Sequence, residues 1–261
     1  MNIRTYYQND AFLAYIDLLG TSILYKENMA PLQKQAERLF RSLIAHFDTE
    51  FENMIGKDNR VHFNVNIYAD SIMIYLKSNE DHLVVKLIQF LLKFQWVLIF
   101  EQDSEIGPVP FMALIDQQPF FSIRVESPEE WSIMQPEFTT CSLCGGKGLI
   151  KMDEKLKKLP VGVYISGKIK DRLSDKVLQE RCVPVKGDDL YFIKQDNRSI
   201  DFLFLPIVQG NPTSHIEGST LEEILKNLFS EGMTKYQETK WRQWIDVHES
   251  TIYEIARIND E

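Results

Sequence analysis

Two runs of alternating apolar and polar residues are separated by only two positions in the first third of the chain. The runs are VHFNVNIY at 61–68 and SIMIYLKS at 71–78, with Ala69 and Asp70 between them. Alternation with a period of two is typical of a strand with one buried face, and so short a connection permits only antiparallel pairing. The sequence therefore predicts a β-hairpin with Asp70 near its tip.

Four further segments surround this hairpin. The apolar run at 12–17 ends at Asp17 and predicts a buried strand followed by a loop, and 108–116 predicts another strand. Apolar residues at helical spacing predict helices over 30–54 and 79–102. The resulting order is that of a ferredoxin-like split βαβ core of the α/β (α+β) class. We expect helices on one face of its sheet and a free face for a ligand or partner.

The rest of the chain is predicted to extend this core. Residues 123–140 show little periodicity and predict an irregular insertion. We expect one domain over 1–210, closed by a C-terminal β-hairpin, and a C-terminal helical extension over 211–261 that opens with a Ser-x-x-Glu capping box. The expected elements of this half are helices at 149–159 and 168–180 and strands at 161–166, 182–193 (interrupted at 186–189) and 200–208.

Charge and composition limit the classes of function. The 261 residues are 44% hydrophobic, enough for a substantial core, and carry a net charge of −9. Neutralising nucleic-acid phosphates needs clustered Lys and Arg, so we expect no nucleic-acid partner. An acidic chain that binds a phosphate ligand would do so best through a divalent cation between its carboxylates and that ligand.

The compartment is predicted to be the cytoplasm. The N-terminal segment lacks the apolar core of a signal peptide, and three cysteines do not complete a disulfide framework. The most apolar stretch, 83–100, is interrupted by two lysines and two glutamines. This composition favours a buried helix over a membrane span, so no membrane partner is expected.

Asp17 and Asp70 form the sharpest candidate site. In a split βαβ sheet the first strand lies beside the hairpin, which would bring the two carboxylates together. Two ionised carboxylates repel each other, and a divalent metal between them is the usual compensation. In the alternative, Asp17 caps a loop and Asp70 makes a turn, roles that Asp often has. The pattern alone leaves both interpretations open.

Three segments resemble a known family. AYIDLLGTS (14–22) resembles the strand-Asp-loop-Gly segment of class III nucleotidyl (adenylate/guanylate) cyclases, and YADSIMIY (68–75) resembles the hairpin that carries their second metal-binding Asp. The stretch 145–166 is similar to the family's Gly-helix-strand segment. The resemblance covers the order of elements from about residue 11 to 166. It is that of a divergent bacterial member, in a group that includes proteins resembling the pyrimidine cyclases of phage defence.

The resemblance implies a nucleotidyl cyclase-like protein that binds a nucleoside triphosphate and acts as a homodimer. In such enzymes the ribose 3′ oxygen attacks the α-phosphate and gives a cyclic nucleotide and pyrophosphate, in bacterial signalling or phage defence. Transposed to this chain, Asp17 and Asp70 would hold Mg²⁺ or Mn²⁺. The backbone facing the phosphates would be that of Leu18, Leu19, Gly20 and Thr21.

The chain also departs from the family pattern. Ile150 and Glu154 stand where the family has an Asn and an Arg, and an acidic side chain cannot stabilise transition-state charge. The strand at 110–118 lacks the family's glycine. These departures support the alternative function, a catalytically inactive cyclase-fold module for nucleotide sensing or protein interaction.

The Cys141-x-x-Cys144 pair resembles half a zinc ribbon. A structural zinc needs four ligands, and only Cys182 and a histidine such as His215 are left to complete them. We therefore expect two reduced thiols in a loop and no structural zinc.

Two other patterns are predicted to be structural. The Gly-Gly-Lys-Gly run at 145–148 lacks the remaining residues of a phosphate loop and is interpreted as flexible backbone, with Lys147 near phosphate as an open alternative. Trp241, Trp244, His248 and Tyr253 are expected to pack in the core or between helices.

Overall fold

The computed structural model describes residues 2–19, 29–68, 71–100, 109–126 and 140–194, together with 235, 239–240, 242–244 and 246. The elements in chain order are β1 (Asn2–Leu18), α2 (Met29–Ile55), the 3-10 helix η1 (Lys57–His62), β2 (Phe63–Tyr68), β3 (Ser71–Leu76), α3 (Asp81–Phe100), β4 (Phe111–Glu126), β5 (Thr140–Gly145), α5 (Lys147–Leu156), β6 (Gly162–Ser166), α6 (Gly167–Arg172), α7 (Lys176–Glu180), β7 (Cys182–Pro184) and β8 (Leu190–Ile193).

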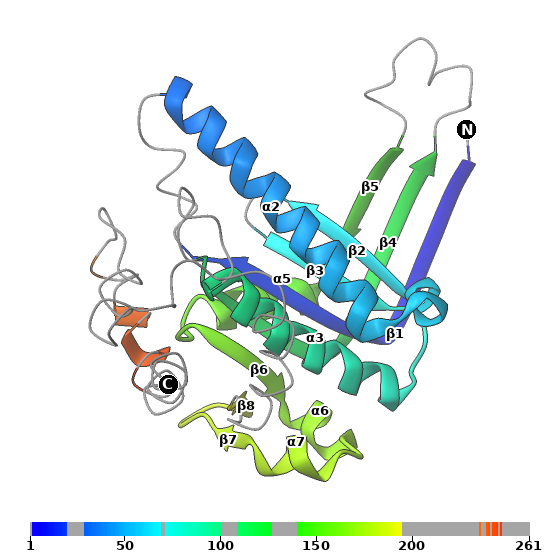
Figure 1. Cartoon of the computed structure of the whole chain (residues 1–261). Coiled ribbons are helices and arrows are strands. Elements are labelled where there is room, and N and C mark those ends of the chain that lie inside the picture. The colour runs from blue at the N-terminus through cyan, green and yellow to red at the C-terminus, as the bar shows by residue number, and fades with distance from the viewer. Residues whose placement is uncertain are drawn as a thin grey trace.

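One mixed sheet organises the fold (Figure 1). Its strand order is β2-β3-β1-β4-β6-β8-β7, and β5 pairs with β4 away from this path. The predicted hairpin is present as the antiparallel pair β2 and β3, and β3 lies beside β1 as the split βαβ order predicts. The pairing of β4 with β6 is parallel. The predicted mixed α/β class is therefore confirmed.

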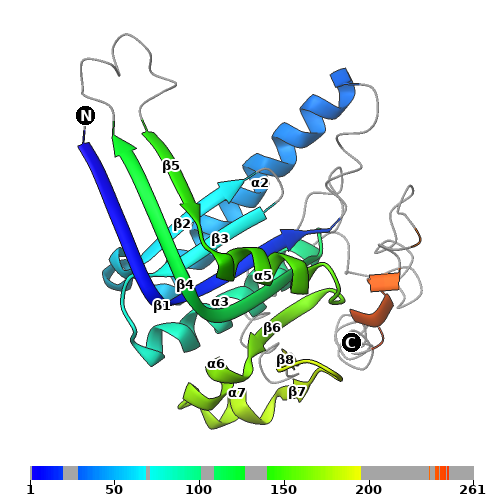
Figure 2. The same ribbon diagram turned by 180° about the vertical axis from the view of Figure 1, so that it is seen from behind.

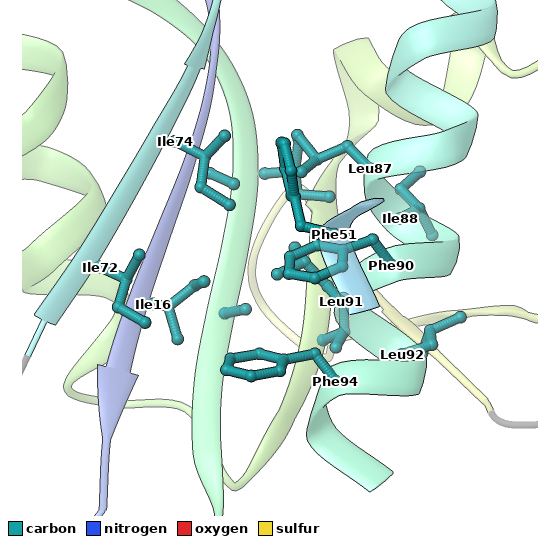
Figure 3. Close-up of a cluster of buried hydrophobic side chains, with 14 of the residues drawn as sticks. Ile16, Phe51, Ile72, Ile74, Leu87, Ile88, Phe90, Leu91, Leu92 and Phe94 are labelled. Atoms are coloured by element: carbon teal, nitrogen blue, oxygen red, sulfur yellow. The ribbon is translucent and has the colours of Figure 1, made fainter. Parts of the chain in front are cut away.

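Helices α2 and α3 cover one face of the sheet. In α2 the buried residues Leu43, Phe47 and Phe51 recur at four-residue spacing, so one stripe of the helix faces inward. Figure 3 shows Ile16, Ile72 and Ile74 of the strands facing side chains of α3 and Phe51. We call this the helix face; alternate strand residues supply it, namely Phe12, Ala14, Ile16 and Leu18 of β1, Ile72, Ile74 and Leu76 of β3, and Phe111, Ala113 and Ile115 of β4.

Helix α3 explains the long apolar stretch in the sequence. By length and composition, Asp81–Ile99 meets the criteria for a membrane span, with a mean hydropathy of 1.5. In the fold 72% of that apolar window is buried, and residues such as Leu87, Phe90 and Phe94 have no exposed surface. The prediction of a buried helix is confirmed.

The opposite face of the sheet is free only in part, which corrects the expectation from sequence. Helix α5 lies across it (Figure 2), and Met152 and Leu156 are buried in one cluster with Leu114 and Tyr164 of the strands. The periodicity of α5 explains this, because its apolar residues recur at helical spacing and need a surface to cover. We call this side the site face, because Asp17 lies on it.

Strands β1 and β4 are longer than predicted. Their outer halves pair with each other from Asn2 opposite Glu126 to Gln8 opposite Phe120, with a register shift between Gln8 and Ala11. Figures 1 and 2 show these halves and β5 projecting from the rest of the sheet. The predicted insertion at 123–140 is therefore wrong at both ends, since 123–126 belong to β4 and Thr140 begins β5. Residues 127–139 lie outside the described part of the chain.

The segment from α5 to β8 largely follows the prediction. The predicted helix at 168–180 is two helices, because Asp175 caps α7 by accepting hydrogen bonds from the N–H groups of Val177 and Leu178. Strands β7 and β8 pair antiparallel around the predicted interruption. The predicted strand at 200–208 and the capping box fall on residues outside the described ranges.

Trp244 is fully buried, as the aromatic pattern predicts. Its ring lies 6.0 Å from that of Trp96 on α3, measured between centroids. Nearby, the N–H of Val161 donates to the carbonyl oxygen of Lys240 over 3.4 Å. Trp241, His248 and Tyr253 are not among the described residues. The division into 1–210 and 211–261 stays a prediction.

Candidate functional site

Asp17 lies near the end of β1 in the centre of the sheet. Its partners in register are Ser71, the first residue of β3, and Met112 of β4. Residues alternate between faces along β1, so Asp17 shares the site face with Tyr15 and Leu13. The carboxylate is half-buried. A half-buried carboxylate at the end of a central strand is accessible to a ligand while its backbone is held on both sides.

Polar side chains adjoin Asp17 on the same face. The hydroxyl of Tyr15 donates to Oγ of Ser71 over 3.1 Å. On β2, Asn66 and Asn64 pair with Met73 and Tyr75 and are partly exposed. The β2-β3-β1 part of the site face therefore carries hydroxyl and amide groups beside buried apolar residues such as Met73, whereas α5 covers the β4-β6 part.

The second predicted ligand, Asp70, lies outside the described residues. Its chain neighbour Ser71 is the register partner of Asp17. The described ends of β2 and β3 thus bring the hairpin connection to the strand end that carries Asp17. The separation of the two carboxylates stays a prediction.

The loop predicted to face phosphate begins with two anchored residues. Leu18 and Leu19 are 4% and 8% exposed, so their side chains are committed to the core. The N–H of Leu19 donates to the carbonyl of Pro110 over 2.8 Å, which occupies that donor. Gly20 and Thr21 are not among the described residues. Phosphate contact through this backbone stays a prediction. The N–H of Leu19 already donates to Pro110.

Lys157, in the turn after α5, is an exposed lysine that pairs with Asp153. Its Nζ lies 2.6 Å from Oδ2 of Asp153. That hydrogen bond and the charge of Asp153 are the main causes that raise the pKa of Lys157, and Tyr15 and Asp17 contribute by electrostatic attraction. The contribution of Asp17 is the smallest of these causes, and the Lys157 side chain is 65% exposed.

Ile150 and Glu154 lie on the outer side of α5. Ile150 is 62% exposed, and Glu154 is exposed as well, whereas Met152 and Leu156 face the sheet. Neither residue therefore turns toward the sheet of its own chain.

The glycine run before α5 has a structural role, which corrects its interpretation as flexible backbone. Gly146 has φ of 145°, and a Cβ there would lie 2.7 Å from the carbonyl oxygen of Pro119. A Cβ on Gly148 would lie 2.4 Å from Cβ of Gln118. These glycines let the first turn of α5 approach β4 closely. Lys147 is exposed at this end.

Asp116 is a buried carboxylate on the site face that the sequence did not mark as functional. It is 5% exposed and accepts hydrogen bonds from the backbone N–H of Gln117 and from Nε2 of Gln118, at 2.8 and 2.6 Å. Its register partner is Leu13, four residues from Asp17 along β1. At about 3.4 Å per residue this separation is about 14 Å, too far for a shared metal.

The described residues contain no group of three or more His, Cys, Asp or Glu side chains that could hold a metal ion. A metal at Asp17 would therefore need Asp70, substrate phosphates or water as its other ligands, which is the usual coordination of Mg²⁺. Cys141 and Cys144 lie on β5 rather than in a loop, opposite Val125 and Ser122. Burial raises the pKa of the Cys182 thiol, which favours the protonated form. The absence of a structural zinc stays a prediction.

Sequence reasoning missed Tyr15 and Ser71 beside Asp17, and Lys157 after α5. Tyr15 and Ser71 have a simple signal, because one is two residues from Asp17 on a strand and the other follows Asp70. Lys157 has none, since its position depends on how α5 crosses the sheet.

Comparison with known proteins relates this arrangement to one fold. No protein-family model matches the sequence, and no curated protein matches it. The catalytic core of a rhodopsin-guanylyl cyclase with converted specificity, in complex with ATPalphaS, superposes with a TM-score of 0.52 at 10% identity, covering 75% of this chain and 99% of that chain.

Two further guanylyl cyclase domains give the same result. The guanylate cyclase domain of RhGC from Catenaria anguillulae, in complex with GTP, has a TM-score of 0.52 at 10% identity and covers 73% of this chain and 98% of its own. A dimeric guanylyl cyclase domain of the RhoGC fusion protein from Blastocladiella emersonii has a TM-score of 0.52 at 7% identity, with 74% and 97% covered. The chain therefore has the fold of these cyclase domains, at only 7–10% sequence identity to them.

Proposed function

We propose that the protein binds a nucleoside triphosphate with a divalent metal at Asp17 and Asp70, and that it converts the triphosphate to a cyclic nucleotide and pyrophosphate. The observation that carries this proposal is the position of Asp17 in a cyclase fold. It lies at the end of the central strand β1, directly opposite the first residue after the hairpin connection. The same position in the sequence motif is that of a metal-binding Asp in the family that the chain resembles.

The residues around Asp17 fit Mg²⁺ or Mn²⁺. Both are hard cations that prefer oxygen ligands, and Asp17 supplies a partly exposed carboxylate next to the Tyr15 and Ser71 hydroxyls. When bound, the cation would neutralise triphosphate charge and favour the ionised form of the attacking 3′ hydroxyl. The protein's part is to fix the carboxylate, which the β3 and β4 ladders on either side of Asp17 do.

The loop after β1 would position the phosphates. Leu18 and Leu19 anchor its first residues through burial and the hydrogen bond to Pro110. The N–H groups of Gly20 and Thr21 are then the proposed phosphate donors, because glycine permits close approach of backbone to a ligand. Rigid anchoring next to the metal ligand is useful here, since phosphoryl transfer depends mainly on positioning and charge neutralisation.

We also propose a homodimer. The outward-facing positions Ile150 and Glu154 do not serve the site of their own chain. In the resembled family the active site forms between two domains, so the corresponding α5 surface would face a second copy. Sedimentation of the purified protein with and without a metal-nucleotide complex tests this arrangement.

The function is tested by incubating the protein with Mn²⁺ and each of the four ribonucleoside triphosphates, followed by mass spectrometry for cyclic products. Calorimetric titration with a nonhydrolysable triphosphate and Mn²⁺ should show binding that Asp17→Asn and Asp70→Asn each abolish. Asp10→Asn, an exposed change on the same strand, is the matched control and should bind normally. Binding without product would support the inactive sensing module. No binding by the wild type would overturn the metal-nucleotide function.

A further inference from the structure

Strand β2 ends the strand order of the sheet, so only one of its two sides is paired, to β3. The N–H of Lys77 donates to the carbonyl of His62 over 2.8 Å, and these two residues continue the β2-β3 register as a hydrogen-bonded pair. Hydrogen-bonded pairs alternate along an antiparallel ladder, so the even-numbered residues of β2 bond to β3. The backbone N–H and C=O groups of Val65 and Ile67 therefore point away from the sheet.

This outer side of β2 is unprotected. Within the described part of the chain, no backbone group bonds to Val65 or Ile67 on that side, and both residues are only partly buried. The strand, FNVNIY, contains no charged residue, proline or glycine, which are the residues that usually block pairing at an edge. The other end of the strand order is blocked, because β7 has three residues and ends in Pro184.

Exposed apolar side chains lie on the flank of α2 next to β2. Phe51 contacts Phe63 at the start of β2, with ring centroids 5.3 Å apart, and Figure 1 shows α2 running alongside β2 in the opposite direction. Phe40 and Ile44 belong to the stripe of Phe51 by helical spacing, yet they are 42% and 41% exposed. The other flank of α2 forms an ion pair with α3. Apolar surface therefore continues beside the unpaired edge.

The edge is complementary to itself. An antiparallel copy of β2 related by a two-fold axis at Val65 would give three kinds of pair: Val65 with Val65, Phe63 with Ile67, and Asn64 with Asn66. The first two kinds lie on the helix face, where Phe63 is buried and Val65 and Ile67 pack against the same cluster. This register pairs apolar with apolar residues on one face and amides on the other, without like charges opposite each other.

We propose that two copies of the protein associate through β2, so that their sheets become one continuous sheet. At its centre the N–H of each Val65 donates to the carbonyl of the other copy's Val65. The N–H of Ile67 donates to the carbonyl of Phe63, whose own N–H already donates to Arg60. The contact uses the same surface twice and closes on itself. It goes beyond the proposed function, and it leaves α5 uncovered, since α5 packs on β4.

Sedimentation velocity of the full chain over a range of concentrations tests the association. Val65→Lys places two ammonium groups opposite each other at the two-fold axis and should weaken association by at least about tenfold. Val183→Lys, the matched change on the edge strand β7, should sediment like the wild type. Circular dichroism of both variants checks that they are folded.

Hydrogen exchange of the wild type tests the same contact without a substitution. The amides of Val65 and Ile67 should exchange rapidly in dilute protein and at least about tenfold more slowly at concentrations where the association forms. The amides of Asn64 and Asn66 are the control within the strand. They bond to β3 in either state, so their exchange should depend far less on concentration.

The outcomes separate this contact from the dimer proposed through α5. If the wild type associates but Val65→Lys associates equally well and the two outer amides gain no protection, the contact uses another surface. The β2 inference is then refuted while the α5 dimer stands. A large assembly that Val65→Lys reduces to a dimer would support both contacts. A monomer at every concentration would refute both and leave the nucleotide-binding function untouched.

Discussion

The two faces of the sheet are built from different chemistry. On the helix face, α2 and α3 bury an almost wholly apolar surface in which aromatic rings such as Phe47, Phe90 and Phe94 contact one another. On the site face, Asp17 lies between apolar and polar neighbours: its register partner Met112 is buried in the cluster that α5 covers, and its other partner, Ser71, accepts a hydrogen bond from the Tyr15 hydroxyl. The same strands supply both faces, because successive residues along a strand point to opposite sides of the sheet.

This difference separates stability from function along a single strand. On β1, Ile16 is fully buried against the helices, and its neighbour Asp17 is half-exposed on the other side. A substitution on the helix face should therefore change the free energy of unfolding, whereas one near Asp17 should change ligand binding. The predictions below test this separation, beginning with the largest effect on stability.

Phe90→Ala should lower the free energy of unfolding by about 3–5 kcal/mol, the usual range for a fully buried aromatic residue. Phe90 has no exposed surface and contacts the rings of Phe47, Phe51 and Phe94. Urea denaturation followed by circular dichroism gives the change. Phe40→Ala, at a position on α2 that is 42% exposed, is the control and should cost far less. Equal losses in the two variants would refute the assignment of the core.

Gly148→Ala tests the contact between α5 and β4 and should cost about 1–3 kcal/mol, the range for overpacking. The added Cβ would lie 2.4 Å from Cβ of Gln118, so the helix or the strand must shift. Thermal melts compare it with Lys151→Ala, an exposed change in the same helix. If Gly148→Ala is as stable as the control or more stable, the first turn of α5 does not pack as closely as described.

The sequence predicted the centre of the sheet well because its strands there carry clear patterns. The alternation in 61–68 and 71–78 and the apolar run before Asp17 depend only on which side of a strand is buried. Both α2 and α3 follow from apolar spacing in the same way. For these elements local pattern and tertiary packing agree, so pattern was sufficient.

The projecting halves of β1 and β4 show where pattern was not enough. The run FSIRVE at 121–126 does alternate between apolar and polar residues. Pro119 and the polar residues before it nevertheless indicate the end of a strand, so the sequence did not predict that β4 continues through this run. The polar N-terminal part of β1 is a strand because it pairs with β4, a partner more than a hundred residues away. The candidate site shows the same contrast. The motif around Asp17 was sufficient to predict it, whereas the position of Lys157 depends on how α5 packs on the sheet.

His46 should make a smaller, pH-dependent contribution on the helix face. Burial lowers its pKa below the ordinary value of 6.5, although the Glu50 carboxylate opposes that shift. The unfolded chain therefore binds a proton more readily, so this contribution to stability is complete above pH 6.5 and falls as the pH decreases below it. Between pH 6.5 and 5 the free energy of unfolding should decrease less in His46→Gln than in the wild type, by a difference of less than about 1 kcal/mol. His82→Gln, at an exposed position of α3, should leave the slope unchanged.

Asp17→Asn should have the smallest effect on the stability of the metal-free protein, within about 0.5 kcal/mol of zero, as for surface substitutions. Asn is nearly isosteric with Asp, so the backbone pairing of residue 17 with Ser71 and Met112 is retained. Two terms then act in opposite directions. Loss of the carboxylate removes its attraction to Lys157, which destabilises slightly, and it removes repulsion from any nearby carboxylate, which stabilises slightly. Thermal melts in the presence of a chelator measure the net change in stability.

A decrease in the free energy of unfolding above about 1 kcal/mol would mean that the carboxylate serves the fold through hydrogen bonds, which is the structural alternative for this residue. A melting temperature that is unchanged or raised, combined with lost metal-nucleotide binding, would instead show that the Asp17 carboxylate serves ligand binding and that the stability of the core does not depend on it.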